Sequence, residues 1–487
     1  MKLPTAMVPL IGFAPDMPHS TPGVIVSAAN IVPTANGFAG APSVVTQMPA
    51  LPTACRGSAV TADIFGVRRI YAGTATGLFH QVLGAWTNVS RAGGYTDSGD
   101  NLWSFAQFGN ATIAANDTDT IQAAVSGGAF ANIAGAPKAK IVLSSADFVL
   151  AFNTEDATYG DQGDRWWCSA FRDHSSWSPS VTTQATTGRL IGDGGDITAA
   201  SRMGSQVVAY KSRSMFVGTY VGPAAVWQWD RVPGDMGCVG PRAVCDMGGP
   251  QVFVGEDNIW MFDGTRPVPM GIGAVRDWFA ERLSQTHRHK TICTFEPSVA
   301  RVWIFFVSND SPDQEIDTAL VYHLARKTWG VVSIGVETAM HYVSDGVSMD
   351  SWPGTFDTLP SVSFDSSFWL SGSRVLAVFG RDHTLGALTG ISSSSAFTTG
   401  DIGDDDQATL VRSVRLRYST LPAAASVQGY TKAVSSDAPA SAAAAGPIAD
   451  GKFDCRQSAR WHRFEFSFTG DVEFAGLKLD ISSAGMR

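Results

Sequence analysis

The chain has 487 residues, which is too long for a single small hydrophobic core. Charged residues make up only 16 % of it and its formal net charge is −9, so electrostatic binding of nucleic acid by the chain as a whole is not expected, although the chain could still enclose nucleic acid. Such low charge leaves uncharged surface that a free monomer tends to avoid and a subunit of an assembly can bury.

Six scattered cysteines do not form the dense framework of a small disulfide-rich protein. The closest pair, Cys238 and Cys245, lacks the two-residue spacing typical of zinc ligands, so we expect buried thiols and no metal site. No run of 18 apolar residues occurs, and no membrane-spanning helix is expected. Synthesis and folding in a reducing cytoplasm is the expectation.

The first 56 residues carry proline or glycine every few positions, with short apolar pieces such as Gly23–Val26 between them. This pattern predicts an extended amino-terminal arm over 1–56 that lies on other protein and has no core of its own.

Over residues 57–390 the pattern changes to short runs rich in β-branched and aromatic side chains, and turn residues follow each run. Gln206–Tyr210 and Val302–Val307 are examples. Only Val275–Leu283 has helical spacing, with Val275, Phe279 and Leu283 on one face. The sequence therefore predicts an all-β body with one helix.

An approximate repeat of 40 to 50 residues runs through this region, and an aromatic residue closes each unit. Four short strands per unit of this length are typical of a β-propeller blade. We expect six blades, with seven as the alternative, and a chain of several β-sandwiches as the competing fold class. The tryptophans predicted at blade edges are Trp86, Trp177, Trp229 and Trp329.

Residues 391–487 open with a serine run and an acidic segment at 401–406, and then alternate as strands do, for example over Trp461–Phe468. We expect a small carboxy-terminal antiparallel β domain here. The Ala/Ser-rich stretch 422–447 is predicted to be a long loop within it.

Motifs that carry chemistry are missing from the sequence. It has no nucleophile elbow, zincin helix or phosphate-binding loop. The acidic segment at 401–406 lacks the ligand spacing of a calcium loop. No catalytic, cofactor-binding or metal-ligating residue is therefore predicted.

Several segments together carry a resemblance to a known family. They are Asn30–Pro33, Tyr71–Ala75, Trp86–Arg91, Trp103–Asn110 with Ala115–Asn116, Phe216–Pro223, Val252–Pro267 and Arg460–Phe464. On these residues the chain resembles the tail nozzle proteins of short-tailed bacteriophages, those similar to tail tubular protein B. The 422–447 stretch departs from the family pattern.

This resemblance implies a structural, propeller-bearing subunit of the virion tail that is not an enzyme and is assembled in the host cytoplasm. It implies a ring of six copies that contacts the tail adaptor and often tail fibres, and through which viral DNA leaves without specific binding. Because such a conduit must not hold phosphates, we expect acidic and small polar side chains along its lumen. The candidates are Asp401, Asp404, Asp405 and Asp406. The alternative is a propeller that binds or hydrolyses glycans.

Overall fold

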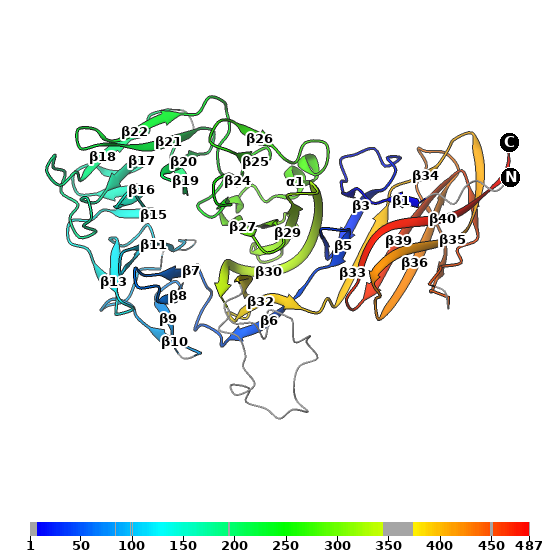
Figure 1. Ribbon diagram of the computed structural model, residues 1–487, viewed down its shortest axis with the longest axis horizontal. Helices are drawn as coiled ribbons and strands as arrows, with labels where there is room; N and C mark the ends of the chain where they lie inside the picture. Colours follow the sequence, from blue (N-terminus) through cyan, green and yellow to red (C-terminus); the bar gives the residue numbers. More distant parts are fainter. Residues whose placement is uncertain are drawn as a thin grey trace.

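The computed structural model describes residues 7–343 and 374–486, apart from positions 83, 98, 100, 193–194 and 449–450. Two β-rich bodies lie side by side along the longest axis of the molecule (Figure 1). The larger body is a β-propeller, and the smaller is a sandwich of two sheets that holds strands from both ends of the chain.

Five four-stranded antiparallel blades follow one another along the chain. The first blade contains β7 (Gly57–Ala62), β8 (Arg68–Gly73), β9 (Leu78–Val82) and β10 (Ala85–Asn88), and the second contains β11 (Ser104–Phe108), β12 (Ala111–Ala115), β13 (Gln122–Val125) and β14 (Ala131–Asn132). The third contains β15 (Lys138–Ser145), β16 (Phe148–Asp156), β17 (Gly160–Cys168) and β18 (Thr186–Arg189). The fourth contains β19 (Ile197–Met203), β20 (Gln206–Lys211), β21 (Met215–Gly222) and β22 (Val226–Arg231), and the fifth contains β23 (Val244–Asp246), β24 (Gln251–Val254), β25 (Ile259–Phe262) and β26 (Pro267–Pro269).

One long strand, β30 (Thr328–Val343), serves two blades. Its first half pairs with β29 (Ile316–His323) and completes a sixth blade with β27 (Ile292–Glu296) and β28 (Arg301–Phe306). From Val336 onward it pairs with β31 (Arg374–Gly380). This second half becomes the innermost strand of a further blade.

The seventh blade is completed by β32 (Leu385–Gly390) and by β6 (Ser43–Met48) from the amino-terminal segment. The innermost strands β7, β11, β15, β19, β23, β27 and β30 each contact the next, and β30 contacts β7. The described residues thus close a ring of seven blades. The expectation of six is wrong and its alternative of seven holds, because the last blade combines distant segments that leave no repeat in the sequence.

The helix predicted over 275–283 is confirmed as α1 (Arg276–Arg282), which lies between the fifth and sixth blades next to the single turn η1 (Arg288–Lys290). Phe279 packs edge-on against Phe306 with ring centroids 5.0 Å apart. The carboxylate of Asp16 accepts hydrogen bonds from the backbone N–H groups of Asp277 and Trp278, at 2.8 and 3.0 Å. A residue of the amino-terminal segment therefore caps this helix. No helix in the described part of the chain is long and apolar enough to span a bilayer.

The smaller body has two facing sheets. One contains β2 (Gly12–Phe13), β3 (Val24–Ala29), β33 (Ser394–Thr399), β34 (Ile402–Gly403), β39 (Trp461–Thr469), β36 (Ala424–Lys432) and β37 (Ala440–Ala445). The other contains β1 (Met7–Pro9), β5 (Phe38–Gly40), β40 (Glu473–Met486), β35 (Gln407–Thr420) and β38 (Gln457–Ala459). Phe397 of the first sheet stacks on Phe474 of the second with centroids 4.8 Å apart, so aromatic rings fill the space between the sheets.

The loop predicted over 422–447 is wrong, because β36 and β37 form a hairpin there. All nine residues of β36 pair with β39, and Val427 points into the core, where it is buried. Alanine and serine disfavour strands in isolation, but a partner strand that satisfies the backbone overrides that weak preference.

The amino-terminal segment joins the two bodies. Its strand β4 (Ile31–Pro33) pairs with β30 at Val331 and with β5, and β5 pairs with β40. One hydrogen-bonded sheet thus runs from the sixth blade into the sandwich (Figure 1). The described part of residues 1–56 lies on the rest of this chain, because its strands pair with strands of the propeller and of the sandwich.

Asn30 stands at this junction and uses both ends of its amide. Its Oδ1 accepts from the backbone N–H of Ser333 at 3.0 Å, and its Nδ2 donates to the carbonyl of Ser394 at 3.2 Å. The first partner belongs to the sixth blade and the second to the sandwich. Its φ of 54° is left-handed, a conformation that asparagine tolerates better than most residues.

Gly330 permits the closest approach at the junction, because a Cβ atom there would lie 2.3 Å from the carbonyl oxygen of Ile31. We predict that Gly330→Ala lowers the free energy of unfolding by about 1–3 kcal/mol, since the added methyl group must push β4 away from β30. Denaturant unfolding measures this change. The matched control is Gly446→Ala, which meets no atom within 4 Å and should change stability by less than about 0.5 kcal/mol. Equal effects of the two substitutions would contradict the assignment.

The neutral imidazole of His462 connects the two sheets of the sandwich. Gln457 Nε2 donates to its Nδ1 at 3.0 Å, which leaves its Nε2–H to donate to Thr409 Oγ1 at 2.9 Å. Burial lowers the pKa of His462 to about 4. An unfolded histidine has a pKa of about 6.5. Between pH 4 and pH 6.5 the unfolded chain therefore binds a proton at this histidine that the folded chain does not bind.

We therefore predict that this group contributes stability that is fully present above pH 6.5 and is lost as the pH falls toward 4. Between pH 7.5 and pH 5 the loss amounts to about 2 kcal/mol. The measurement compares unfolding at the two pH values for the wild type, for His462→Gln and for His174→Gln, a control in the propeller. Of the two variants, only His462→Gln should reduce the change in the free energy of unfolding between the two pH values. A change as large as that of the wild type in this variant would refute the assignment.

Candidate functional site

The loops that precede the innermost strands converge at one end of the propeller axis. Three hollows meet there, with volumes of about 280, 320 and 410 Å³. The third lies inside the ring, between β7, β23, β27 and the second half of β30. The first shares Leu102 with the second and Arg242 with the third. We call the first hollow the axial cavity.

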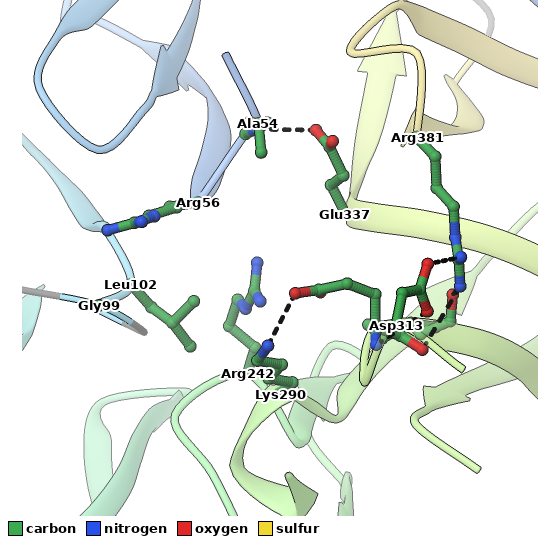
Figure 2. Close-up of a pocket in the computed structure, with 12 residues that line it drawn as sticks. Ala54, Arg56, Gly99, Leu102, Arg242, Lys290, Asp313, Glu337 and Arg381 are labelled. Carbon is green, nitrogen blue, oxygen red and sulfur yellow. Dashed lines mark hydrogen bonds and ion pairs between the residues drawn. The ribbon is translucent and has the colours of Figure 1, made fainter. Parts of the chain in front are cut away.

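The axial cavity is lined by segments from five blades (Figure 2). Its four basic and three acidic side chains are Arg56, Arg242, Lys290, Arg381, Asp313, Glu315 and Glu337. Arg56, Arg242 and Lys290 come one or two positions before the innermost strands β7, β23 and β27. The ring geometry brings them together, although they are far apart in the sequence.

Most of these charges form ion pairs. The Arg56 guanidinium lies 2.7 Å from a carboxylate oxygen of Asp97, and the Lys290 ammonium lies 2.8 Å from Glu315. Arg381 pairs with Asp313 on the far wall of the cavity. These pairs hold the wall in one arrangement and leave little free charge on the groups involved.

Glu337 is also engaged. It accepts from the backbone N–H of Cys55 at 2.7 Å and lies 2.5 Å from Nδ1 of His383. Burial raises the pKa of Glu337, while these two contacts oppose the shift. Burial likewise raises the pKa of the Cys55 thiol to about 12. Cys55 is therefore a neutral thiol and has none of the thiolate character of a nucleophile.

Arg242 differs from the other basic residues of the cavity. Its Nη1 donates to Thr338 Oγ1 at 2.9 Å, and its Nε is buried with no hydrogen-bond partner. Among the described residues no carboxylate lies within ion-pair distance of it. Figure 2 shows its guanidinium rising from the base of the cavity into the open space. Burial lowers the pKa of Arg242 to about 10.

Of the four tryptophans predicted at blade edges, three lie on outermost strands. Trp86 is on β10, where it packs against Phe379 at 5.8 Å, and Trp229 is on β22, where it packs against Trp166 at 5.5 Å. Trp329 is on the first half of β30 and packs against Tyr322 at 4.5 Å. Trp177 lies in the connection between β17 and β18 of the third blade.

The acidic residues predicted to line a lumen belong to the sandwich. Asp401 is buried between Lys432 and Arg463, at 2.7 and 2.8 Å, so the structure contradicts its assignment to a channel wall. Burial alone would raise the pKa of Asp401, but the hydrogen bonds from Arg463 and Lys432 outweigh it and the pKa lies below its usual value. Asp404, Asp405 and Asp406 are exposed, and Asp405 accepts from Trp461 Nε1 at 2.6 Å.

The cysteines are free, and those of the propeller are buried. Cys245 and Cys293 of neighbouring innermost strands approach with their sulfur atoms 3.1 Å apart. Among the described residues no group of three or more His, Cys, Asp or Glu side chains is placed to hold a metal ion.

The residues of the axial cavity were not singled out from the sequence. The signal they leave is a basic residue one or two positions before a predicted innermost strand, as at Arg56, Arg242 and Lys290. That signal has meaning only once the strands that form the inner ring are known.

No protein-family model matches the sequence, and no curated protein matches it. Among solved structures, the computationally designed Ika8 protein has 12 % identity and a TM-score of 0.36, over 72 % of this chain and 99 % of its own. YCF48 bound to D1 peptide has 11 % identity and a TM-score of 0.39, over 74 % and 97 %. BamB from Moraxella catarrhalis has 12 % identity and a TM-score of 0.38, over 74 % and 96 %.

The burial of the tryptophans differs enough to test their roles. We predict that Trp177→Ala and Trp329→Ala, each of a residue only 2 % exposed, lower the free energy of unfolding by about 3–5 kcal/mol. The partly exposed Trp86 fills less of the core, so Trp86→Ala should lower the free energy of unfolding by clearly less than the other two substitutions. Denaturant unfolding with a fluorescence or circular dichroism signal provides the comparison. Equal, small losses for all three substitutions would show that these side chains do not pack the blades.

Proposed function

We propose that this chain is a structural subunit of the tail of a short-tailed bacteriophage and that it forms a nozzle ring. The observation that carries the proposal is the continuous backbone sheet from the sixth blade through β4 and β5 into the sandwich. Such a junction resists relative movement of the two bodies, because moving them breaks hydrogen bonds between strands. A subunit that transmits load within a particle benefits from that stiffness.

Two of the segments that resemble nozzle proteins lie at structural joints, which supports a scaffolding role. Asn30–Pro33 forms the junction between propeller and sandwich. Trp103 packs between the first two blades, where its Nε1 donates to the Thr74 carbonyl at 2.8 Å. A Cβ atom on Gly73 would lie 2.2 Å from the Trp103 ring, so this contact requires glycine.

Exposed apolar side chains support assembly with other subunits. Ile64 and Phe65 are 70 % and 77 % exposed in the turn between β7 and β8, and Val67 next to them is also exposed. An apolar cluster of this kind on one turn is typical of a surface that another protein covers.

In this proposal the protein acts in the virion tail as a homo-oligomeric ring of six copies and has no enzymatic activity of its own. The tail adaptor binds one end of the ring and tail fibres contact its side. Viral DNA passes through the ring without specific binding, in keeping with the net charge of −9 per subunit.

The axial cavity favours a second candidate, a propeller that binds or hydrolyses glycans. Arginines and carboxylates converge there, as such an enzyme requires. Its three acidic side chains, however, already contact cationic partners or a backbone donor. Release of sugar from a glycan by the purified chain, abolished by Glu337→Gln, would favour this candidate over the structural one.

The assembly proposal predicts that the full-length chain is present in purified phage particles and forms a six-copy species in native mass measurements. Phe65→Ser should shift that species toward smaller forms without lowering the unfolding temperature, because the side chain is already exposed to solvent in the isolated subunit. The control is Leu421→Ser, an exposed apolar residue of the sandwich that should leave the mass unchanged. A chain that is monomeric inside particles, or missing from them, would refute the proposal.

A further inference from the structure

Arg242 stands where the axial cavity opens into the interior of the ring, and it lines both hollows. Its position is fixed from two sides. The backbone carbonyl of Arg242 accepts from the N–H of Cys293 on β27 at 2.8 Å, and its guanidinium donates to Thr338 on β30. The backbone of Arg242 is therefore anchored to the sixth blade and its guanidinium to the seventh before any ligand is present.

The hydrogen-bonding capacity of Arg242 is mostly unused. A guanidinium has five N–H donors, and Nη1 makes the one side-chain hydrogen bond found for it within the described residues. Arg56, Lys290 and Arg381 each have a carboxylate partner, whereas Arg242 has none in the part of the chain that the structure describes. The guanidinium of Arg242 extends into the axial cavity (Figure 2).

An unpaired charge held among protein atoms is costly, because water no longer solvates it fully and no opposite charge replaces the water. The depressed pKa of Arg242, about 10 through burial, reflects that cost. Asp97, which pairs with Arg56, brings the acidic side chains at the cavity to four, equal to the number of basic ones. The cavity charge that has no carboxylate partner among the described residues is that of Arg242, and a single bound anion would supply that partner.

We propose that the axial cavity binds one small oxyanion, a carboxylate or phosphate group, through the guanidinium of Arg242. The planar fork of arginine matches the spacing of two oxyanion oxygens, and Thr338 orients that fork. A volume of about 280 Å³ accommodates a compact anion. This inference is independent of the assembly role proposed above, because the site lies within one subunit.

The test measures the unfolding temperature of the full-length chain in phosphate, in acetate and in chloride at equal ionic strength. The wild type should unfold at least about 2 °C higher in phosphate or in acetate than in chloride, because a ligand that binds only the folded state stabilises it. Stabilisation by phosphate alone assigns a phosphate group as ligand, and stabilisation by both anions assigns the wider oxyanion class. No stabilisation by either anion overturns the proposal.

Two variants separate binding at Arg242 from general salt effects, which act on every variant alike. Arg242→Gln keeps a donor for Thr338 and should lose the anion-dependent increment. Arg213→Gln removes the same charge from a side chain that is 64 % exposed and paired with Glu256, and it should keep the increment. An increment that survives Arg242→Gln overturns the proposal. If Arg242→Gln does not fold, Arg242→Lys takes its place, because it keeps the charge without the fork and should weaken anion binding several-fold in titration calorimetry.

Discussion

The architecture depends on the pairing of β30 with the amino-terminal segment. The outermost strand of a blade leaves a row of unpaired backbone groups, and proteins must cover or pair such an edge. In the sixth blade this edge accepts Ile31, and Gly330 allows the two backbones to approach because it has no side chain. Through this pairing the propeller and the sandwich share one sheet.

The second half of β30 is subject to a related constraint. It serves as the innermost strand of the seventh blade, whose outermost strand β6 comes from the other end of the chain. The ring is therefore closed by hydrogen bonds between segments that are distant in sequence, with Met48 buried against the blade core. Residues 7–48 are thus an integral part of both bodies.

Much of the local structure could be predicted from the sequence. The strands of the first five blades and the helix after Val275 follow from hydrophobic periodicity and turn residues, which act over a few positions. The seventh blade could not be predicted, because the change of partner at Val336 leaves no local pattern. The strand β36 escaped prediction for a similar reason, since its alanines are held by pairing with β39.

The candidate site was harder to predict than the fold. Arg56, Arg242 and Lys290 are ordinary surface-type residues in the sequence, and the closed ring alone brings them to one cavity. Asp401 illustrates the opposite case, in which an acidic residue of a polar segment is buried by cations on two other strands. Composition predicts how many charges a chain has, but tertiary pairing decides which of them remain available to a partner.

The junction at Asn30 also sets the order in which this protein can fold during synthesis. Asn30 leaves the ribosome early, yet its partner Ser394 follows 364 residues later. At about 5–20 residues per second the ribosome needs roughly 20–70 s to supply that partner. Until their distant partners emerge, the strands of the amino-terminal segment can pair only with one another, as β2 does with β3 and β4 with β5, and their other edges are open to aggregation or to chaperones. Completion of both bodies therefore waits until the sandwich strands from Ser394 onward have been synthesised.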